Sequence, residues 1–222
     1  MGIGFFLIML ILPIVAHINV TATFKKYSKV RNSRGLTADQ VARKILDDNG
    51  LSYITIERVS GDLTDHFDPT ANVVRLSDTV YGSSSIAAIG VAAHECGHAC
   101  QHAEEYAPIQ IRSAFVPVVN ICSKLWYLVF MIGVALIEVF PSLIYAGIIM
   151  FGAVVLFQLI TLPVEFDASG RALKTLDDYG ILESNEIPKA RKVLTAAALT
   201  YVTALVVSLM QLLRLLAAAK RR

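Results

Sequence analysis

Long apolar runs, separated by two polar stretches, dominate the pattern of this chain. Three of the runs contain no Asp, Glu, Lys or Arg: residues 2–24, 142–164 and 193–213. A fourth run, roughly 116–140, contains Lys124 and Glu138, two charges that can reach a membrane interface. Because a helix of about 20 apolar residues crosses a hydrocarbon core, the pattern predicts four membrane spans. A turn at Pro141-Ser142 is predicted to join the second and third spans as a hairpin.

The first polar stretch combines a helical and an alternating pattern. Thr37 and Gln40 have the spacing of an N-cap and the third helical residue, which predicts a helix that stops at Asn49-Gly50. Residues 53–59 then alternate as a strand, and residues 72–77 are predicted to pair with them as a β-hairpin. The edge of such a hairpin offers backbone groups to an extended peptide.

The run His94-Glu95-Cys96-Gly97-His98 carries the strongest chemical signal. It follows residues 83–93, whose serines and small apolar residues predict a buried helix. On a helix the two histidines lie one turn apart on one face, with Glu95 beside the first, which is the spacing of a hydrolytic zinc site. Zinc would activate a water, and Glu95 would take its proton as the water attacks a peptide carbonyl. The motif predicts a zinc peptidase.

An open zinc site needs a third protein ligand, and the sequence offers three candidates. Glu165 is favoured, because it lies where the third span leaves the membrane and can project back toward the histidines. Asp167 competes for this role or orients a histidine as an outer carboxylate. His102 follows on the same helix, but three histidines on successive turns extend over about 12 Å and cannot all reach one ion. We therefore expect His102 beside the site or on the surface.

Composition places the predicted enzyme in a membrane. Of 222 residues, 55% are hydrophobic and only 17% are charged, and the mean hydropathy is +0.58. These values are too apolar for an ordinary soluble domain. The net charge of +2 is small, and the sequence contains no nucleic-acid-binding motif. We therefore expect no DNA or RNA partner.

Charge near the spans predicts the orientation. The first apolar run lacks a positive region before it, so we expect an uncleaved anchor. Directly after it comes a basic cluster that belongs in the cytoplasm: Lys25, Lys26, Lys29, Arg31 and Arg34. The zinc motif would then face the cytoplasm. The basic tail from Arg214 to Arg222 conflicts with this four-span topology.

Three cysteines in a cytoplasm-facing protein are expected to be free thiols. Cys96 and Cys100 lie about 200° around the helix from the histidines at 3.6 residues per turn. They are therefore expected to pack on the opposite face rather than to bind zinc.

Several separated motifs resemble one known family: DHFDP at 65–69, VRLS at 74–77, HECGHACQH at 94–102 and PVEFDASGRAL at 163–173. Nearly the whole chain is similar to the YugP-type neutral zinc metallopeptidases of bacterial membranes, and more distantly to the HtpX protease and the CAAX prenyl protease. The resemblance implies His94, His98 and Glu165 as zinc ligands and Glu95 as general base. Where the HtpX-type motif has an aspartate four residues after its glutamate, this chain has Ser169.

Four residues are candidates for stabilising the oxyanion of the transition state, because each has a cation, a phenol or an imidazole to donate. His66 is preferred over Tyr81, Arg171 and Tyr179. The predicted catalytic residues are thus Glu95 and His66.

Together these patterns predict a mainly α, integral membrane helical bundle with a small α+β zincin-like cytoplasmic catalytic part. The predicted divisions are an anchor (2–24), a cytoplasmic part with the β-hairpin and zinc helix (25–113), a transmembrane hairpin (114–164), a cytoplasmic segment with the third ligand (165–192), and a last transmembrane helix with the basic tail (193–217). The predicted function is a membrane-bound zinc endopeptidase whose partners are the lipid bilayer and a peptide or membrane-protein substrate. An intramembrane protease and a zinc-binding scaffold without catalysis are the alternatives.

Overall fold

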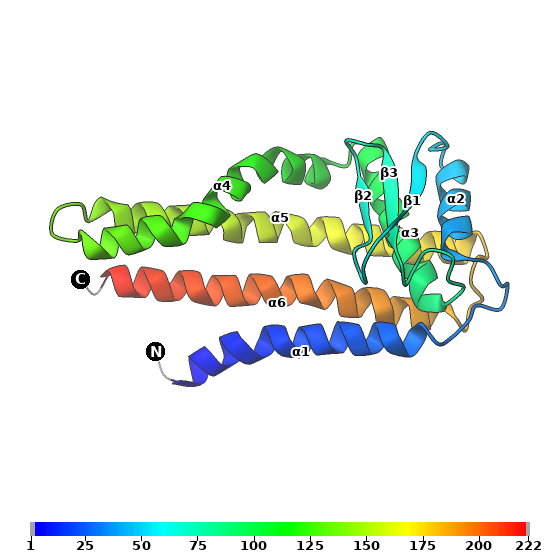
Figure 1. Ribbon diagram of the computed structural model, residues 1–222, viewed down its shortest axis with the longest axis horizontal. Coiled ribbons are helices and arrows are strands. Elements are labelled where there is room, and N and C mark those ends of the chain that lie inside the picture. The colour runs from blue at the N-terminus through cyan, green and yellow to red at the C-terminus, as the bar shows by residue number, and fades with distance from the viewer. Residues whose placement is uncertain (1–2, 221–222) are drawn as a thin grey trace.

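The computed structural model describes residues 3–220 and is mainly helical (Figure 1). Its elements, in chain order, are α1 (Ile3–Tyr27), α2 (Ala38–Asp48), β1 (Thr55–Val59), β2 (His66–Asp68), β3 (Val73–Ser77), α3 (Ile86–Ala103), α4 (Ala107–Ala135), α5 (Ser142–Asp178) and α6 (Ile187–Lys220). In the described part of the chain, α1, α4, α5 and α6 are long and apolar enough to cross a membrane. This agrees with the four predicted spans. The predicted anchor starts at residue 2, and the basic tail ends in Arg221 and Arg222; these three positions lie outside the described residues.

The four long helices form a bundle with a small head at one end, made of the sheet, α2 and α3 (Figure 1). Helix α6 lies between α1 and α5, and the start of α1 and the end of α6 lie at the end of the bundle away from the head. Apolar side chains point outward from α1, where Leu10 is 65% exposed and Ile18 is 60% exposed. An apolar exterior of this kind suits a hydrocarbon solvent rather than water.

Helices α4 and α5 form the predicted antiparallel hairpin, and two glycines let them approach closely. A Cβ on Gly147 would lie 2.7 Å from the Cβ of Phe130, and one on Gly133 would lie 2.5 Å from the backbone nitrogen of Ile144. Small residues at a helix interface are a common means of close packing in membranes. Near its N-terminus α4 diverges from α5 toward the head (Figure 1).

The sheet differs from the predicted hairpin. Its strand order is β1-β3-β2, and β1 and β3 are neighbours as expected but run parallel, with Thr55 opposite Val73. The short strand β2 lies in the predicted loop 60–71 and pairs antiparallel with β3. The hairpin is therefore β2–β3, and its turn is fixed by Asp68, whose carboxylate accepts the backbone N–H of Thr70 at 3.0 Å. Two parallel strands need a connection that carries the chain from the end of the first strand back to the end of the sheet where that strand began. Between β1 and β3, the segment that contains β2 makes this connection.

Helix α3 is the central element of the head. It begins where predicted, because Ser85 caps it by accepting the N–H of Ala88 at 3.2 Å. It packs against α2, α5 and α6, and most of its residues are buried. Cys96 is fully buried with its thiol 3.6 Å from the carbonyl of Ala42, and Cys100 is also buried. In the described residues all cysteines are free thiols.

Helix α5 continues past the predicted end of the third span without a break. Pro163 lies inside it, and Glu165 follows on the same helix. Gly97 of α3 lies against α5, where an added Cβ would be 2.8 Å from the carbonyl oxygen of Ala168. The absence of a side chain at Gly97 therefore brings the histidine helix within reach of the Glu165 carboxylate.

Candidate metal centre

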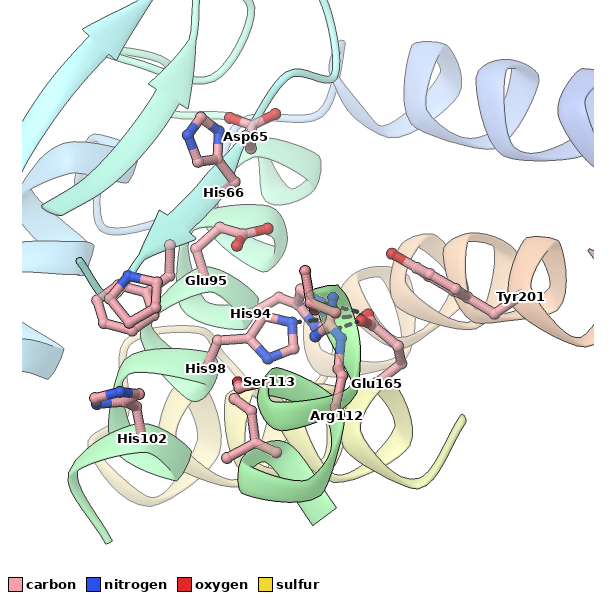
Figure 2. A pocket seen from close by; sticks show the side chains of 14 residues that line it. Asp65, His66, His94, Glu95, His98, His102, Arg112, Ser113, Glu165 and Tyr201 are labelled. Carbon is pink, nitrogen blue, oxygen red and sulfur yellow. Dashed lines mark ion pairs between the residues drawn. The ribbon is translucent and has the colours of Figure 1, made fainter. Parts of the chain in front are cut away.

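Three side chains from two helices converge at the junction of the head and the bundle. His94 and His98 lie one turn apart on α3, with ring centroids 4.7 Å apart, and Glu165 reaches them from α5 (Figure 2). The Glu165 Oε2 atom is 3.4 Å from His94 Nε2 and 3.7 Å from His98 Nε2. One ligand atom from each of the three lies within 4.8 Å of the others, close enough to hold one metal ion. The three predicted ligands are thus the cluster that the fold brings together.

The outer nitrogen of each histidine has a partner of its own. The Ser169 hydroxyl lies 3.1 Å from His94 Nδ1, and Gln101 Oε1 lies 2.9 Å from His98 Nδ1. Since the amide oxygen of Gln101 can only accept, it fixes His98 as the Nδ1–H tautomer and leaves Nε2 free as a ligand. Two imidazole nitrogens and one carboxylate, all aimed at one point, match the donor set that zinc prefers at an open site.

Gln101 also joins the two helices that carry the ligands. Its side chain is fully buried, and its Nε2 donates to the Val164 carbonyl and to Asp167, each at 2.8 Å. Val164 directly precedes Glu165, so one amide orients His98 and holds the backbone beside the third ligand. Gln101 was missed in the sequence, because only its place three residues after His98 indicates that it faces the same side.

The two competing ligands lie outside this cluster. Asp167 reaches His98 only through Gln101, and it also accepts a hydrogen bond from Arg171 Nε at 2.5 Å. His102 packs its ring edge-on against Phe67, with centroids 5.9 Å apart, and is exposed at the rim of the site. Ser169, which replaces the expected aspartate, bonds to His94 directly.

A cavity of about 320 Å³ opens over the cluster, between the sheet and the start of α4. We call it the head cavity; its walls include Phe67 and Pro69 of the β2 segment and Ile109 and Val116 of α4. Glu95 lines it beside the cluster and is only 8% exposed (Figure 2). A buried carboxylate next to a metal site is where a general base belongs.

Burial and nearby charges shift the pKa of two groups in the cavity. Burial raises the pKa of Asp65, and the negative charge of Glu95 adds to this, against two hydrogen bonds from Ser77 that lower it. Burial lowers the pKa of His98, but the Glu165 carboxylate and the charge of Glu95 outweigh it and raise the pKa. The shift of the Asp65 pKa follows mainly from burial, and the shift of the His98 pKa follows from the nearby carboxylates of Glu165 and Glu95.

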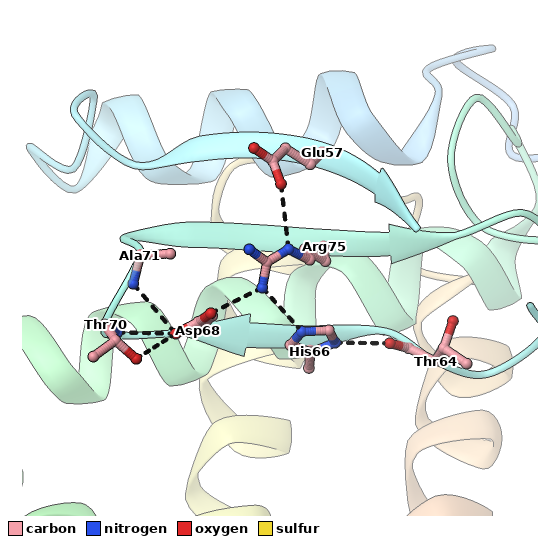
Figure 3. A network of polar contacts seen from close by, with 7 residues as sticks. All are labelled: Glu57, Thr64, His66, Asp68, Thr70, Ala71 and Arg75. Atoms are coloured by element: carbon pink, nitrogen blue, oxygen red, sulfur yellow. Dashed lines mark hydrogen bonds and ion pairs between the residues drawn. The ribbon is translucent and has the colours of Figure 1, made fainter. Parts of the chain in front are cut away.

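His66, the predicted oxyanion donor, lines the head cavity but is held by its neighbours (Figure 3). Its Nδ1 lies 2.8 Å from the Thr64 carbonyl, and its Nε2 lies 3.4 Å from Arg75 Nη1. Since a carbonyl only accepts and a guanidinium only donates, the arrangement favours Nδ1–H and an accepting Nε2. In that tautomer neither nitrogen has a free proton for an oxyanion.

Two further donors line the cavity that sequence reasoning missed. Arg112 of α4 points at the cluster, with Nη1 3.5 Å from Glu165 Oε1. Tyr201 of α6 directs its hydroxyl toward the cavity (Figure 2). Each lies on a mainly apolar helix but has polar neighbours in the sequence, Ser113 beside Arg112 and Thr200 beside Tyr201, so neither stands out from its local pattern.

Comparison with known proteins agrees with this geometry. The model of a family described as "Putative neutral zinc metallopeptidase" matches residues 3–220. The chain is similar to "Putative membrane protease YugP" of Bacillus subtilis, with 52% identity over 199 residues, which covers 90% of this chain and 88% of that protein. No solved structure matches the chain.

Proposed function

We propose that this chain, which belongs to the neutral zinc metallopeptidase family, is a membrane-bound endopeptidase that hydrolyses peptide bonds with a zinc-activated water. One observation carries the proposal: His94, His98 and Glu165 offer ligand atoms within 4.8 Å of one another, with Glu95 in the same cavity. A structural metal site has no need of a carboxylate that lies beside it without joining it.

The chemistry divides between the metal and the side chains around it. The two imidazoles and Glu165 would hold the zinc ion, which would supply a Lewis acid that makes water more acidic and polarises a carbonyl. Glu95 accepts the proton of the attacking water and returns it to the leaving amine. The burial of Glu95 keeps this transfer away from bulk water.

Tyr201 is the donor that we favour for the oxyanion. Its phenol lines the cavity together with both zinc-ligand helices, whereas both ring nitrogens of His66 have partners in the head. Arg112 forms an ion pair with the zinc ligand Glu165, so its charge is already partly neutralised by that carboxylate. His66 stays as the competing donor from the sequence.

The substrate is proposed to bind as an extended strand along β2. This strand is at the edge of the sheet, since the order is β1-β3-β2, and its residues line the cavity over the cluster. An edge strand offers unpaired backbone groups to an incoming peptide. Substrates are therefore expected to be unfolded or extended where they are cut.

The site is proposed to face the cytoplasm. The head lies at the C-terminal end of α1, where Lys25 and Lys26 end the helix. Basic residues next to a span favour the cytoplasmic side. Arg214 and Lys220 of the tail lie toward the other end of the bundle, and they are outnumbered by the basic residues of the head.

Replacing the proposed general base tests the function. Glu95→Gln is expected to lower kcat for peptide cleavage by about 10²–10⁴-fold while zinc content stays near one per chain. Glu105→Gln is the matched control, because Glu105 is exposed just after the same helix. Activity that survives Glu95→Gln contradicts the mechanism, and a cellular role that survives the loss of cleavage favours a zinc-binding scaffold.

A further inference from the structure

A second cavity meets the same metal centre from the side of the bundle. It measures about 410 Å³, within the range of about 300–1,000 Å³ that ligand sites occupy. Its outer walls are His17 and Val20 of α1 and Leu194, Ala197 and Ala198 of α6. We call it the membrane cavity.

The head cavity and the membrane cavity share five residues at the reaction centre, whereas the ligand His98 lines only the head cavity; the five are Asp65, His94, Glu95, Glu165 and Tyr201. Glu95 and the ligand carboxylate of Glu165 are therefore in contact with both cavities. An exopeptidase needs room on only one side of the bond that it cuts, because its substrate ends there. An endopeptidase needs room on both sides.

The membrane cavity extends along a part of α1 that is apolar enough to cross a membrane. If Lys25 and Lys26 of α1 mark the interface, His17 lies about 12 Å further along the helix at 1.5 Å per residue. The walls on α1 and α6 are mainly apolar, with polar side chains at His17, Thr200 and Tyr201. They suit the apolar side chains of a chain that is leaving a bilayer.

From this geometry, and resting on the proposed function, we infer that the membrane cavity is a substrate subsite. The substrate segment next to a transmembrane anchor, on one side of the scissile bond, binds in the membrane cavity. The segment on the other side of the bond lies along β2 in the head cavity. The preferred substrates are membrane-anchored polypeptides, cut within an extended segment close to the anchor. The occupant is polypeptide rather than lipid, because the cavity ends at the residues that would perform the cleavage.

Filling the cavity from either wall tests this inference. Ala197→Phe fills it from α6, where Ala197 is half-buried, and Val20→Trp fills it from α1, where Val20 is also half-buried. Ala204→Phe is the matched control, because Ala204 is exposed on α6 and lies outside the walls of both cavities. Zinc content and helical circular dichroism report whether each variant has folded.

The substrate is found with the zinc-loaded wild-type protein in lipid nanodiscs and a proteome-derived library of end-blocked peptides, with cleavage sites read by mass spectrometry. The best peptide is then made in full length and in two forms, each truncated to two residues on one side of the cut. In the wild type, the truncation that empties the membrane cavity is expected to lower kcat/KM at least tenfold.

Ala197→Phe and Val20→Trp are expected to lower kcat/KM for the full-length peptide at least tenfold. In these variants, kcat/KM for the full-length peptide is then expected to be close to kcat/KM for the peptide whose truncation empties the membrane cavity, so that the ratio of the two values is near one. Ala204→Phe is expected to keep the wild-type ratio. An unchanged ratio in both filled variants overturns the inference, whether their activity is intact or uniformly reduced. If the zinc-loaded wild type cleaves no library peptide, the proposed function itself fails, and the inference fails with it.

Discussion

At the scale of single residues, the centre depends on side chains that never touch the metal. His94 and His98 each have their outer nitrogen held, by Ser169 at 3.1 Å and by Gln101 at 2.9 Å. These bonds fix which nitrogen is free to bind and which way the ring points. Gln101 does more than Ser169, because it also bonds to the backbone that precedes Glu165.

Gln101→Leu is expected to weaken zinc binding by about 10–100-fold. The leucine leaves the buried Nδ1–H of His98 without an acceptor and releases the Val164 carbonyl. Competition with a chromophoric chelator measures the affinity. Gln110→Leu on the exposed face of α4 is the control, and equal affinities for the two variants would mean that Gln101 orients nothing.

Steady-state kinetics of two variants distinguish Tyr201 from His66 as the oxyanion donor. Tyr201→Phe removes one hydroxyl and is expected to lower kcat by about 10²–10³-fold with little change in KM, because the bond forms in the transition state. His66→Ala is expected to change kcat less, because its ring nitrogens have partners in the head. The opposite order of effects would restore His66 as the donor.

The sequence predicted the three clustered residues because their chemistry is local or motif-based. The spacing of His94 and His98 follows from a helical turn, and Glu165 stands out as a charge at the foot of an apolar run. Gln101, Arg112 and Tyr201 were not predictable in this way. Their roles depend on which helices pack together, and a glutamine, arginine or tyrosine has many ordinary uses at a membrane surface.

At the scale of elements, the helices followed from the sequence and the sheet topology did not. Apolar runs and the Ser85 cap predict α3 and the long helices from local signals. Strand direction depends on the path of the connection, and the three residues of β2 are too few to produce an alternating pattern. The turn that Asp68 stabilises joins β2 to β3 rather than β1 to β3.

The contact between α3 and α5 is the element-scale feature on which the centre depends. Gly97→Ala places a Cβ 2.8 Å from the Ala168 carbonyl oxygen, so the two helices must separate. We expect a loss of about 1–3 kcal/mol in stability, as for other overpacked sites, together with weaker zinc binding. Thermal unfolding in detergent and chelator competition measure the two effects.

Gly90→Ala on the same helix provides the comparison. Its Cβ would lie 3.7 Å from the Cβ of Ala190, an ordinary contact. Since alanine favours a helix over glycine by about 1 kcal/mol, this variant is expected to be as stable as the wild type or more so. If Gly97→Ala behaves like Gly90→Ala, the close approach of α3 and α5 does not position the ligands.

At the scale of the whole molecule, the transmembrane hairpin of α4 and α5 is what completes the site. It carries the chain away from the head and back, so that Val164 returns to Gln101 after 63 residues. One hydrophobic core then joins α2, α3 and the β-strands to the head ends of α5 and α6. The candidate metal centre lies where this core meets the bundle of long apolar helices.

We expect one zinc ion to join α3 to α5. Anomalous diffraction at the zinc edge from crystals of the purified protein tests it most directly. We expect one peak about 2.0–2.2 Å from the Nε2 atoms of His94 and His98 and from a carboxylate oxygen of Glu165. A peak bound instead by Asp167 or His102, or no peak in protein grown with zinc, would contradict it.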